Sequence, residues 1–148
     1  MINLEPATNF IRESNRIEGI NRAPTPAEIA EYQRFMALGK ITIEELEKFV
    51  SVYQPNASLR RYLGQNVRVG SHVAPPGGPD IVAGLQATLD DMHIVGAWET
   101  HVRYEMLHPF MDGNGRSGRM LWMWQMRGRA PLGFLHTFYY QTLDAARK

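Results

Sequence analysis

The loop HPFMDGNGRSGR, residues 108–119, gathers residue types that are poor material for a regular element or a hydrophobic core. Gly113 and Gly115 allow backbone conformations with positive φ, so successive N–H groups can turn inward and form an anion-binding nest. A helix predicted to begin near Arg116 would direct its N–H groups and the positive end of its dipole at the same place. These features together predict a phosphate-binding site.

The charged side chains of this loop extend the same chemistry. Arg116 and Arg119 are three positions apart on the predicted helix, hence on one face, and both can reach a polyphosphate. Phosphate would repel Asp112 unless a divalent cation lay between them, which implies Mg²⁺ held by one carboxylate and by phosphate oxygens. His108 is the nearby group that can take up a proton near neutral pH, which makes it the candidate general base.

Helices are predicted well before this loop in the chain. Apolar residues at helical spacing favour a helix over about residues 7–18, with Gly19 as its stop signal. Thr25 and Thr42 are each followed three residues later by a glutamate, which is the spacing of a capping box. Each of them also precedes a stretch of helical character, so we expect three helices in the first third of the chain.

A hairpin and further helices complete the predicted fold. Valines alternate with polar residues around a Gly-Ser turn in NVRVGSHVAPP, residues 66–76, which predicts a short β-hairpin. The pattern over residues 81–107 is helical, with a dip near Gly96 that divides or bends it. A buried helix follows the motif loop and ends near Gly128, and a last helix is predicted over residues 131–148. The fold class is therefore all-α (mainly α) with one short β-hairpin.

The composition excludes several classes of protein. With 148 residues, 44% of them hydrophobic and 21% charged, the chain is predicted to form a single domain, residues 1–148, rather than a disordered segment. A net charge of +1 and its even distribution argue against nucleic acid or a membrane surface as a partner. Cysteine is absent, and the start MINLEPATNF lacks the pattern of a signal peptide. We expect a soluble, cytoplasmic protein.

The motif loop resembles, without a gap, the signature HPFx(D/E)GNGRxxR of the Fic family. The hairpin region VRVGSHVAPPGGPDI resembles the flap that precedes this signature, and FYYQTL resembles a tyrosine pair on a following helix, so the resemblance covers nearly the whole chain. It implies the helical Fic fold. It also implies a protein adenylyltransferase, which transfers AMP from ATP, with Mg²⁺, to a Ser, Thr or Tyr hydroxyl of a target protein.

The resemblance carries roles onto individual residues. It implies that His108 deprotonates the target hydroxyl and that Asp112 binds the metal. It implies nucleotide binding by Asp112, Gly113, Asn114, Gly115, Arg116, Ser117, Gly118, Arg119, Tyr139 and Tyr140, the two tyrosines on the adenine side. Flap residues that would dock the target by strand addition are Val67, Arg68, Val69 and Gly70. Doc-type kinases carry Ala and Lys where this chain has Gly113 and Gly115, so nucleotidyl transfer is favoured over phosphorylation.

A second motif lies far away in the sequence. The stretch SNRIEG matches the family's inhibitory pattern (S/T)xxxE(G/N), which implies an inhibitory helix over about residues 7–19 with Ser14, Glu18 and Gly19 as its motif residues. Glu18 placed near Arg119 would form a charge-assisted pair and occupy the place of the ATP γ-phosphate. The N-terminal position of the pattern is typical of class II members of the family.

Alternatives to this reading differ in how well the sequence supports them. The reverse reaction would hydrolyse AMP from a modified protein, with Glu18 orienting water. The sequence does not separate this reaction from AMP transfer, so it stays open. A non-catalytic nucleotide-binding regulatory module would not need His108. A helix-turn-helix DNA binder over residues 25–53 is disfavoured by the even charge, and a metal site at His101 and Glu105 by the absence of an HExxH pattern. The sequence leaves open a homodimer, the target and the activating signal.

Overall fold

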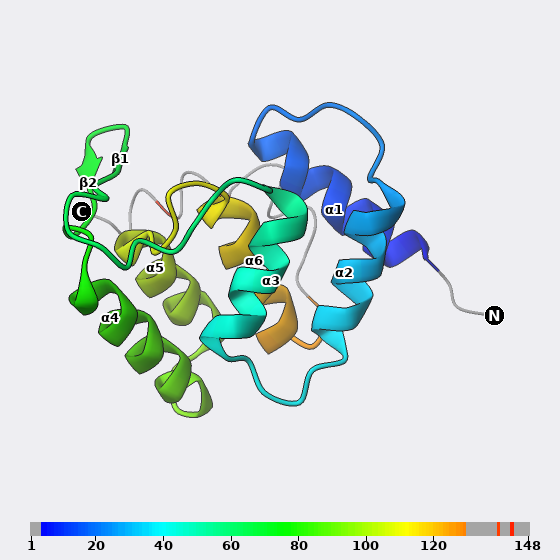
Figure 1. Cartoon of the computed structure of the whole chain (residues 1–148). Coiled ribbons are helices and arrows are strands. Elements are labelled where there is room, and N and C mark those ends of the chain that lie inside the picture. The colour runs from blue at the N-terminus through cyan, green and yellow to red at the C-terminus, as the bar shows by residue number, and fades with distance from the viewer. Residues whose placement is uncertain (1–3, 130–138, 140–142, 144–148) are drawn as a thin grey trace.

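The structure is a computed structural model that describes residues 4–129, 139 and 143, and within them it contains six α-helices and one hairpin (Figure 1). The helices are α1 (Glu5–Ile17), α2 (Pro26–Met36), α3 (Ile43–Tyr53), α4 (Pro79–Asp90), α5 (Ala97–Leu107) and α6 (Asn114–Gln125), with a 3₁₀ turn at Asp91–His93. The hairpin consists of β1 (Arg68–Val69) and β2 (His72–Val73). The predicted all-α fold with one short hairpin is confirmed. The predicted last helix lies outside the described residues except for Tyr139 and Leu143, and Tyr140 lies outside them as well.

Helices α2 and α3 begin at the capping residues that the sequence predicts. Thr25 Oγ1 accepts the N–H of Glu28 at 3.1 Å, and the Glu28 carboxylate accepts the N–H of Thr25 at 2.8 Å, which closes the capping box. Thr42 Oγ1 accepts the N–H of Glu45 at 3.3 Å, but the Glu45 carboxylate is bound to Arg34 instead. Each threonine therefore satisfies a helix-terminal N–H group, which contributes about 1 kcal/mol.

Helix α1 starts two residues before its predicted start and ends one residue before its predicted end. Pro6 lies in its first turn, a position that has no need of a backbone N–H donor. Phe10 and Ile11 are buried on its inner face, and burial of each such side chain contributes about 1.5–3 kcal/mol. After Ile17 the chain turns through Gly19, whose φ of 78° is left-handed.

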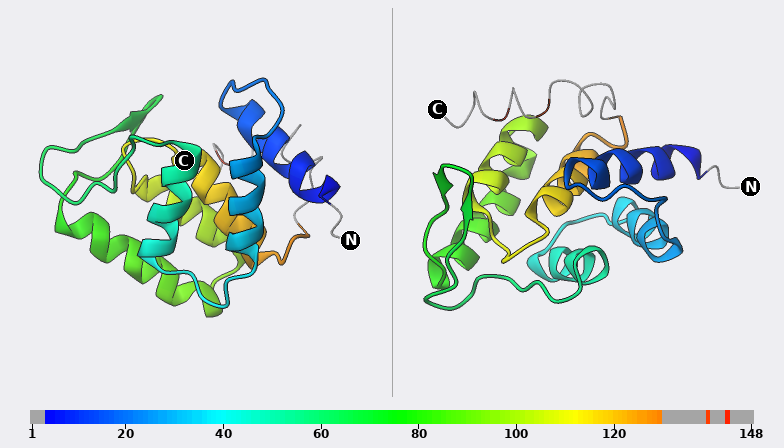
Figure 2. Two further views of the ribbon diagram at one scale, coloured as in Figure 1. Left: turned by 45° about the vertical axis from the view of Figure 1, so that its right-hand side comes forward. Right: turned by 90° about the horizontal axis from the view of Figure 1, so that it is seen from above.

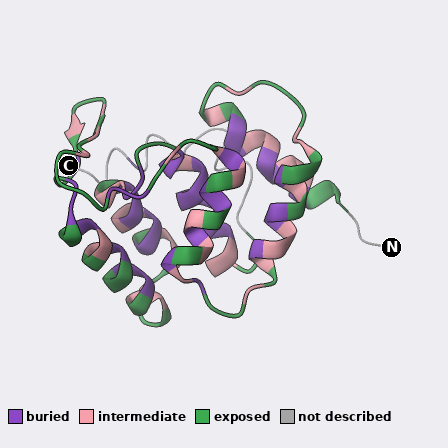
Figure 3. Ribbon diagram, in the orientation of Figure 1, coloured by how far each residue is buried: buried purple, intermediate pink, exposed green. Residues whose placement is uncertain are grey.

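Helix α6 is the central element of the fold. It contacts α1, α2, α3 and α5, and it lies between α5 and the α1–α3 group when the molecule is seen from above (Figure 2). Buried residues line the inward faces of these helices, as the purple segments in Figure 3 show, and Trp122 and Met123 on α6 are among them. Gly118 lets α5 and α6 cross closely, because a Cβ there would come within 2.5 Å of Glu105 Oε1.

Helices α5 and α6 lie on either side of the motif loop. The predicted helical stretch is indeed divided, with α4 ending at Asp90 and α5 beginning after Gly96. Helix α6 begins at Asn114, two residues before its predicted start. Among the described residues no helix has the length and apolar character needed to cross a membrane.

The hairpin is antiparallel, with Arg68 opposite Val73 and Val69 opposite His72. The residues that lead from α3 to the hairpin lie beside the motif loop, because Leu59 forms an isolated antiparallel bridge with Phe110. Figure 1 shows this connection passing next to the loop between α5 and α6. The segment that leads into the flap is thus paired with the motif loop.

Candidate active site

His108 caps the C-terminus of α5 in a left-handed backbone conformation, with φ 52° and ψ 62°. This conformation costs an L-residue roughly 1–2 kcal/mol, so the surrounding structure must hold it. The ring Nδ1 lies 3.2 Å from the carbonyl oxygen of Glu105. A carbonyl oxygen can only accept, so Nδ1 donates, and the neutral ring keeps its lone pair on Nε2.

Asn114 holds the motif loop in shape through its side chain. Its Oδ1 accepts the N–H of Phe110 at 2.8 Å, and its Nδ2 donates to the carbonyl of Phe110 at 2.7 Å. Phe110 is 1% exposed, which anchors the loop in the core. The Asn114 side chain therefore stabilises the shape of the loop.

The two glycines of the motif act differently from one another. Gly113 has a φ of 80° and precedes the first residue of α6, so it makes the turn that leads into this helix. Gly115, which the sequence marks as a second residue suited to positive φ, lies inside the first turn of α6 instead. Its lack of a side chain has another use, because a Cβ there would collide with Oε1 of Glu18.

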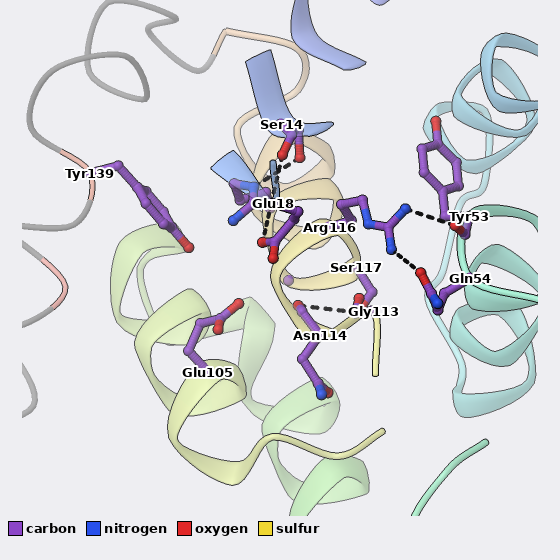
Figure 4. A network of polar contacts seen from close by, with 12 residues as sticks. Ser14, Glu18, Tyr53, Gln54, Glu105, Gly113, Asn114, Arg116, Ser117 and Tyr139 are labelled. Carbon is purple, nitrogen blue, oxygen red and sulfur yellow. Dashed lines mark hydrogen bonds and ion pairs between the residues drawn. The ribbon is translucent and has the colours of Figure 1, made fainter. Parts of the chain in front are cut away.

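Arg119 joins α6 to α1 and to Glu18, the residue that follows α1. Its Nε donates to Ser14 Oγ at 2.8 Å, and its Nη2 donates to the carbonyl of Ser14 at 2.9 Å and to Glu18 Oε1 at 2.8 Å (Figure 4). Arg119 is 1% exposed, whereas the Glu18 side chain is 36% exposed. The predicted pair between Glu18 and Arg119 is present in the structure.

Arg116 points away from Arg119, toward the C-terminus of α3. Its Nη1 donates to the carbonyl of Tyr53 at 2.7 Å, and its Nη2 donates to Gln54 Oε1 (Figure 4). Its Nε is buried and has no hydrogen-bond partner among the described residues. The two arginines line one pocket although their guanidinium groups are held by different helices.

Ser117 and Gly118 have packing roles at this point in the fold. Ser117 is completely buried, and its Oγ donates to the carbonyl of Gly113 at 2.8 Å and lies 2.7 Å from the hydroxyl of Tyr104. Gly118 provides the close crossing of α5 and α6, and its carbonyl contacts His101 Nδ1 at 2.9 Å. Neither of them lines the pocket.

A pocket of about 360 Å³ brings the flap, the motif loop and Glu18 together. Its lining includes Glu18, Val67, Arg68, Val69, Glu105, His108, Asp112, Gly113, Asn114, Gly115, Arg116, Arg119 and Tyr139. Asp112 is exposed, and its Oδ1 accepts the N–H of Gly113 at 2.7 Å. Residues separated by up to about 120 positions in the sequence thus surround one cavity in which His108 and the arginines face the same space.

A larger hollow of about 1230 Å³ lies elsewhere, between the connection after α2, the end of α4 and the C-terminal half of α6. Met36, Leu89, Met92 and Trp124 are among its lining residues, and none of the motif residues is. We therefore place the candidate active site at the smaller pocket, where the groups able to bind phosphate and move a proton converge.

Tyr139 packs against Arg119. The guanidinium carbon of Arg119 lies 5.3 Å from the centre of the Tyr139 ring, and the Tyr139 hydroxyl lies 2.6 Å from Nε2 of His101. Tyr139 is 2% exposed, and burial raises the pKa of its hydroxyl. The His101 ring contacts the Gly118 carbonyl through Nδ1 and the Tyr139 hydroxyl through Nε2. It therefore connects α5 to α6 and to Tyr139 beside the pocket.

Several site residues were not found by sequence reasoning. Tyr53 and Gln54 hold Arg116 from 62 or 63 positions away, and Glu105 lines the pocket from the helix before the motif. No local pattern marks Gln54. Glu105, however, is three residues before His108, a spacing that places its carbonyl within reach of the His108 ring.

Comparison with known protein families tests which family the chain belongs to. No curated protein matches the chain in a sequence search. The model of the Fic/DOC family matches residues 31–126, which include α3 to α6, the flap and the motif loop, while α1 lies outside the match. Proteins of this family transfer nucleotide-derived groups onto proteins. The match covers more than half of the chain, so the chain belongs to the Fic/DOC family.

Proposed function

We propose that this chain is a protein adenylyltransferase that transfers AMP from ATP to a hydroxyl group of a target protein, and that Glu18 inhibits it. One observation carries the proposal. Glu18 is paired with Arg119 in the same pocket that holds His108, Asp112 and the N-terminus of α6. A carboxylate therefore occupies a place suited to a phosphate group, beside a candidate base.

The residues of the pocket fit a magnesium–nucleotide substrate. Asp112 offers an exposed carboxylate, and the described residues contain no group of three or more possible metal ligands, so Mg²⁺ would need phosphate oxygens as well. This is the usual mode for Mg²⁺, which binds through one or two carboxylates together with substrate phosphates. When bound, Mg²⁺ would neutralise phosphate charge and so favour attack at phosphorus.

Protein groups supply the remaining chemistry. Nε2 of His108 accepts the proton of the target hydroxyl, which then attacks the α-phosphorus of ATP, and pyrophosphate leaves. The N–H groups at the start of α6 stabilise charge on the α-phosphate. Arg116 and Arg119 hold the remaining phosphates, and Arg119 can do so only after Glu18 has moved.

The contact with Glu18 is well suited to inhibition because it competes for a buried cation. Burial alone would lower the pKa of Arg119, but Tyr139 and Glu18 raise it above its usual value, so the arginine keeps its charge. Binding of the γ-phosphate then requires that one anion replace another. With Glu18 in place, ATP would bind with its phosphates displaced from in-line attack.

The reverse reaction has one supporting observation. Glu18 lies in the pocket with a partly exposed side chain, from which a carboxylate could orient a water molecule toward an AMP-modified hydroxyl. The experiment below therefore includes an arm for hydrolysis.

Labelled ATP separates these functions. Purified chain is incubated with Mg²⁺, cell lysate and ATP labelled at the α- or the γ-phosphate. Relative to wild type, Glu18→Gly should raise α-label incorporation at least about tenfold, and Glu13→Ala on the same helix should not. Adding His108→Ala to Glu18→Gly should lower the rate about 10²–10⁴-fold without loss of ATP binding.

Three results would contradict parts of the proposal. Incorporation of γ-label would mean phosphorylation. Unchanged α-label in Glu18→Gly would mean that residues 14–19 are only a helix end. Removal of AMP from a modified protein by wild type, but not by Glu18→Gly, would assign the hydrolytic function instead.

A further inference from the structure

Arg60 is a fully buried arginine in the segment that leads from α3 to the flap, with 0% of its surface exposed. A buried guanidinium is normally paired with a carboxylate, because loss of water around an unpaired charge is costly. Among the described residues no carboxylate forms an ion pair with Arg60. Four backbone carbonyl oxygens accept its hydrogen bonds instead.

Two of these carbonyls belong to the candidate base and its neighbour. Nε of Arg60 donates to the carbonyl of His108 at 2.7 Å, and Nη2 donates to that of Leu107 at 2.8 Å. These carbonyls are at the end of α5, where they lack intrahelical donors and where a cation is favoured by the helix dipole. The contact helps to hold His108 in its left-handed conformation.

The other two carbonyls lie at the two ends of the flap. Nη1 of Arg60 donates to the carbonyl of Gln65 at 3.0 Å, before β1, and to that of Pro75 at 2.7 Å, after β2. The backbone of Arg60 repeats this arrangement, because its N–H donates to Pro109 at 2.8 Å and its carbonyl accepts from Gly78 at 3.0 Å. One residue thus binds both ends of the flap and the loop that carries His108.

We propose that Arg60 is a positioning residue for the transfer reaction: it fixes where the flap lies relative to His108. The proposal rests on the proposed function, in which the flap aligns the target and His108 takes its proton. A guanidinium suits this task, since its planar fork reaches carbonyls in several directions, whereas lysine offers one nitrogen. Without it, flap and base could shift independently, and a displacement of about 1 Å can cost about 10²-fold in rate.

Arg60→Lys tests this role, with Arg61→Lys as its matched control. Arg61 is the neighbouring residue, is exposed, and pairs with Glu47 at 2.6 Å on the surface. In the Glu18→Gly background, Arg60→Lys should lower the rate of target labelling at least about tenfold and change the Kd for ATP less than about threefold. Arg61→Lys should change neither. A parallel loss of ATP binding and labelling would overturn the positioning role.

Amide hydrogen exchange tests the same connection without any need for AMP transfer. Arg60→Lys should raise exchange at least about tenfold both at the end of the flap and in the loop of His108, and leave α2 unchanged. The reporting amides, whose acceptors are known, are those of Ala74, Gly78, His108 and Met111. Faster exchange in only one of the two segments, or equally in α2, would mean that Arg60 is an ordinary stabilising residue.

Two further outcomes are distinguishable. If Arg60→Lys does not fold, exchange of the wild-type chain at increasing denaturant decides the matter: the four amides should open together, and separate openings would overturn the proposal. If Glu18→Gly shows no labelling with Arg60 intact, the proposed function fails. The exchange result still decides whether Arg60 couples the flap to His108.

Discussion

Arg119 receives contacts from three kinds of group: a carboxylate, a serine and an aromatic ring. Ser14 on α1 and Glu18, the residue after α1, bind it, and the ring of Tyr139 lies over its guanidinium. Gly115 leaves the room that Glu18 needs for this approach. In the proposed function, the inhibited state depends on Ser14 and Glu18, and their separate contributions can be measured.

Ser14→Ala should activate the enzyme partly. It removes the hydroxyl that accepts from Nε of Arg119 but leaves the pair with Glu18 intact. Loss of one such hydrogen bond is worth about 1 kcal/mol, which corresponds to roughly a fivefold shift between the bound and released states of α1. We expect self-labelling with α-labelled ATP to rise about two- to tenfold, less than in Glu18→Gly.

Ser51→Ala is the control for this substitution, because Ser51 is exposed on α3 and its Oγ donates to the carbonyl of Lys48. It should leave labelling unchanged. Activation by Ser14→Ala equal to that of Glu18→Gly would show that the hydroxyl, and not the carboxylate, sets the resting state.

At the scale of elements, the register of the flap determines which of its backbone groups point outward. The N–H of Ala74 donates to the carbonyl of Val67 at 3.3 Å, so these residues form a hydrogen-bonded pair. Pairs alternate along an antiparallel ladder, so Arg68 and Val73, which face each other, direct their N–H and C=O groups outward. The free edge on the β1 side, where Val67 to Val69 line the pocket, is therefore that of Arg68.

Arg68→Pro should impair modification of target proteins more than binding of ATP. Proline removes the outward N–H of β1 and is tolerated at an edge position that gives no hydrogen bond to the ladder. Loss of one backbone hydrogen bond to the target should lower labelling of lysate proteins about fivefold in the Glu18→Gly background. The measurement is the labelling rate beside the Kd for ATP.

Two variants make this test specific. Arg68→Ala removes the side chain alone, and Val73→Pro removes the corresponding N–H from the opposite edge. Equal losses in Arg68→Pro and Val73→Pro would mean that the hairpin as a whole, rather than its β1 edge, is needed.

At the scale of the whole molecule, the sequence predicts the features that depend on neighbouring residues. The Thr25 capping box, the turn at Gly70 and the break near Gly96 each depend on residues within a few positions of one another. A capping residue or a glycine with positive φ acts on its own neighbours, so its effect can be predicted without knowledge of the fold.

Contacts between distant segments were predicted only where a motif implied them. The pair of Glu18 and Arg119 spans 101 positions and was expected from the resemblance, whereas Gln54 and Arg60 carry no such mark. The partner of Arg116 depends on where α3 ends relative to α6, which packing decides. The same holds for Gly115, whose role follows from the approach of a side chain from α1.

Glu28 connects helices across the whole molecule. Its carboxylate accepts from Asn15 Nδ2 at 3.1 Å on α1 and from Arg22 Nη1 at 2.7 Å, and its carbonyl accepts from the hydroxyl of Tyr53 at 2.8 Å on α3. The carbonyl of Tyr53 in turn accepts from Arg116 on α6. The buried carboxylate of Glu28 thus supports α1, and the backbone of the same residue supports, through α3, an arginine of the site.

Glu28→Gln should therefore destabilise the fold at neutral pH and much less in acid. Burial alone would raise the pKa of Glu28, but hydrogen bonds from Arg22, Thr25 and Asn15 outweigh it and hold the pKa below the usual 4.5. A lowered pKa contributes stability that is fully present above pH 4.5 and is lost as the pH falls through the lower, folded value. Denaturant unfolding at pH 7 should show that Glu28→Gln lowers the free energy of unfolding by about 1–3 kcal/mol, and this difference from wild type should shrink steadily below about pH 4.5.

Glu47→Gln, at a surface pair with Arg61, is the control for this substitution. Its free energy of unfolding should differ from that of wild type by less than about 1 kcal/mol throughout. A difference for Glu28→Gln that stays constant down to pH 3 would show that the side chain acts through its shape and not through its charge.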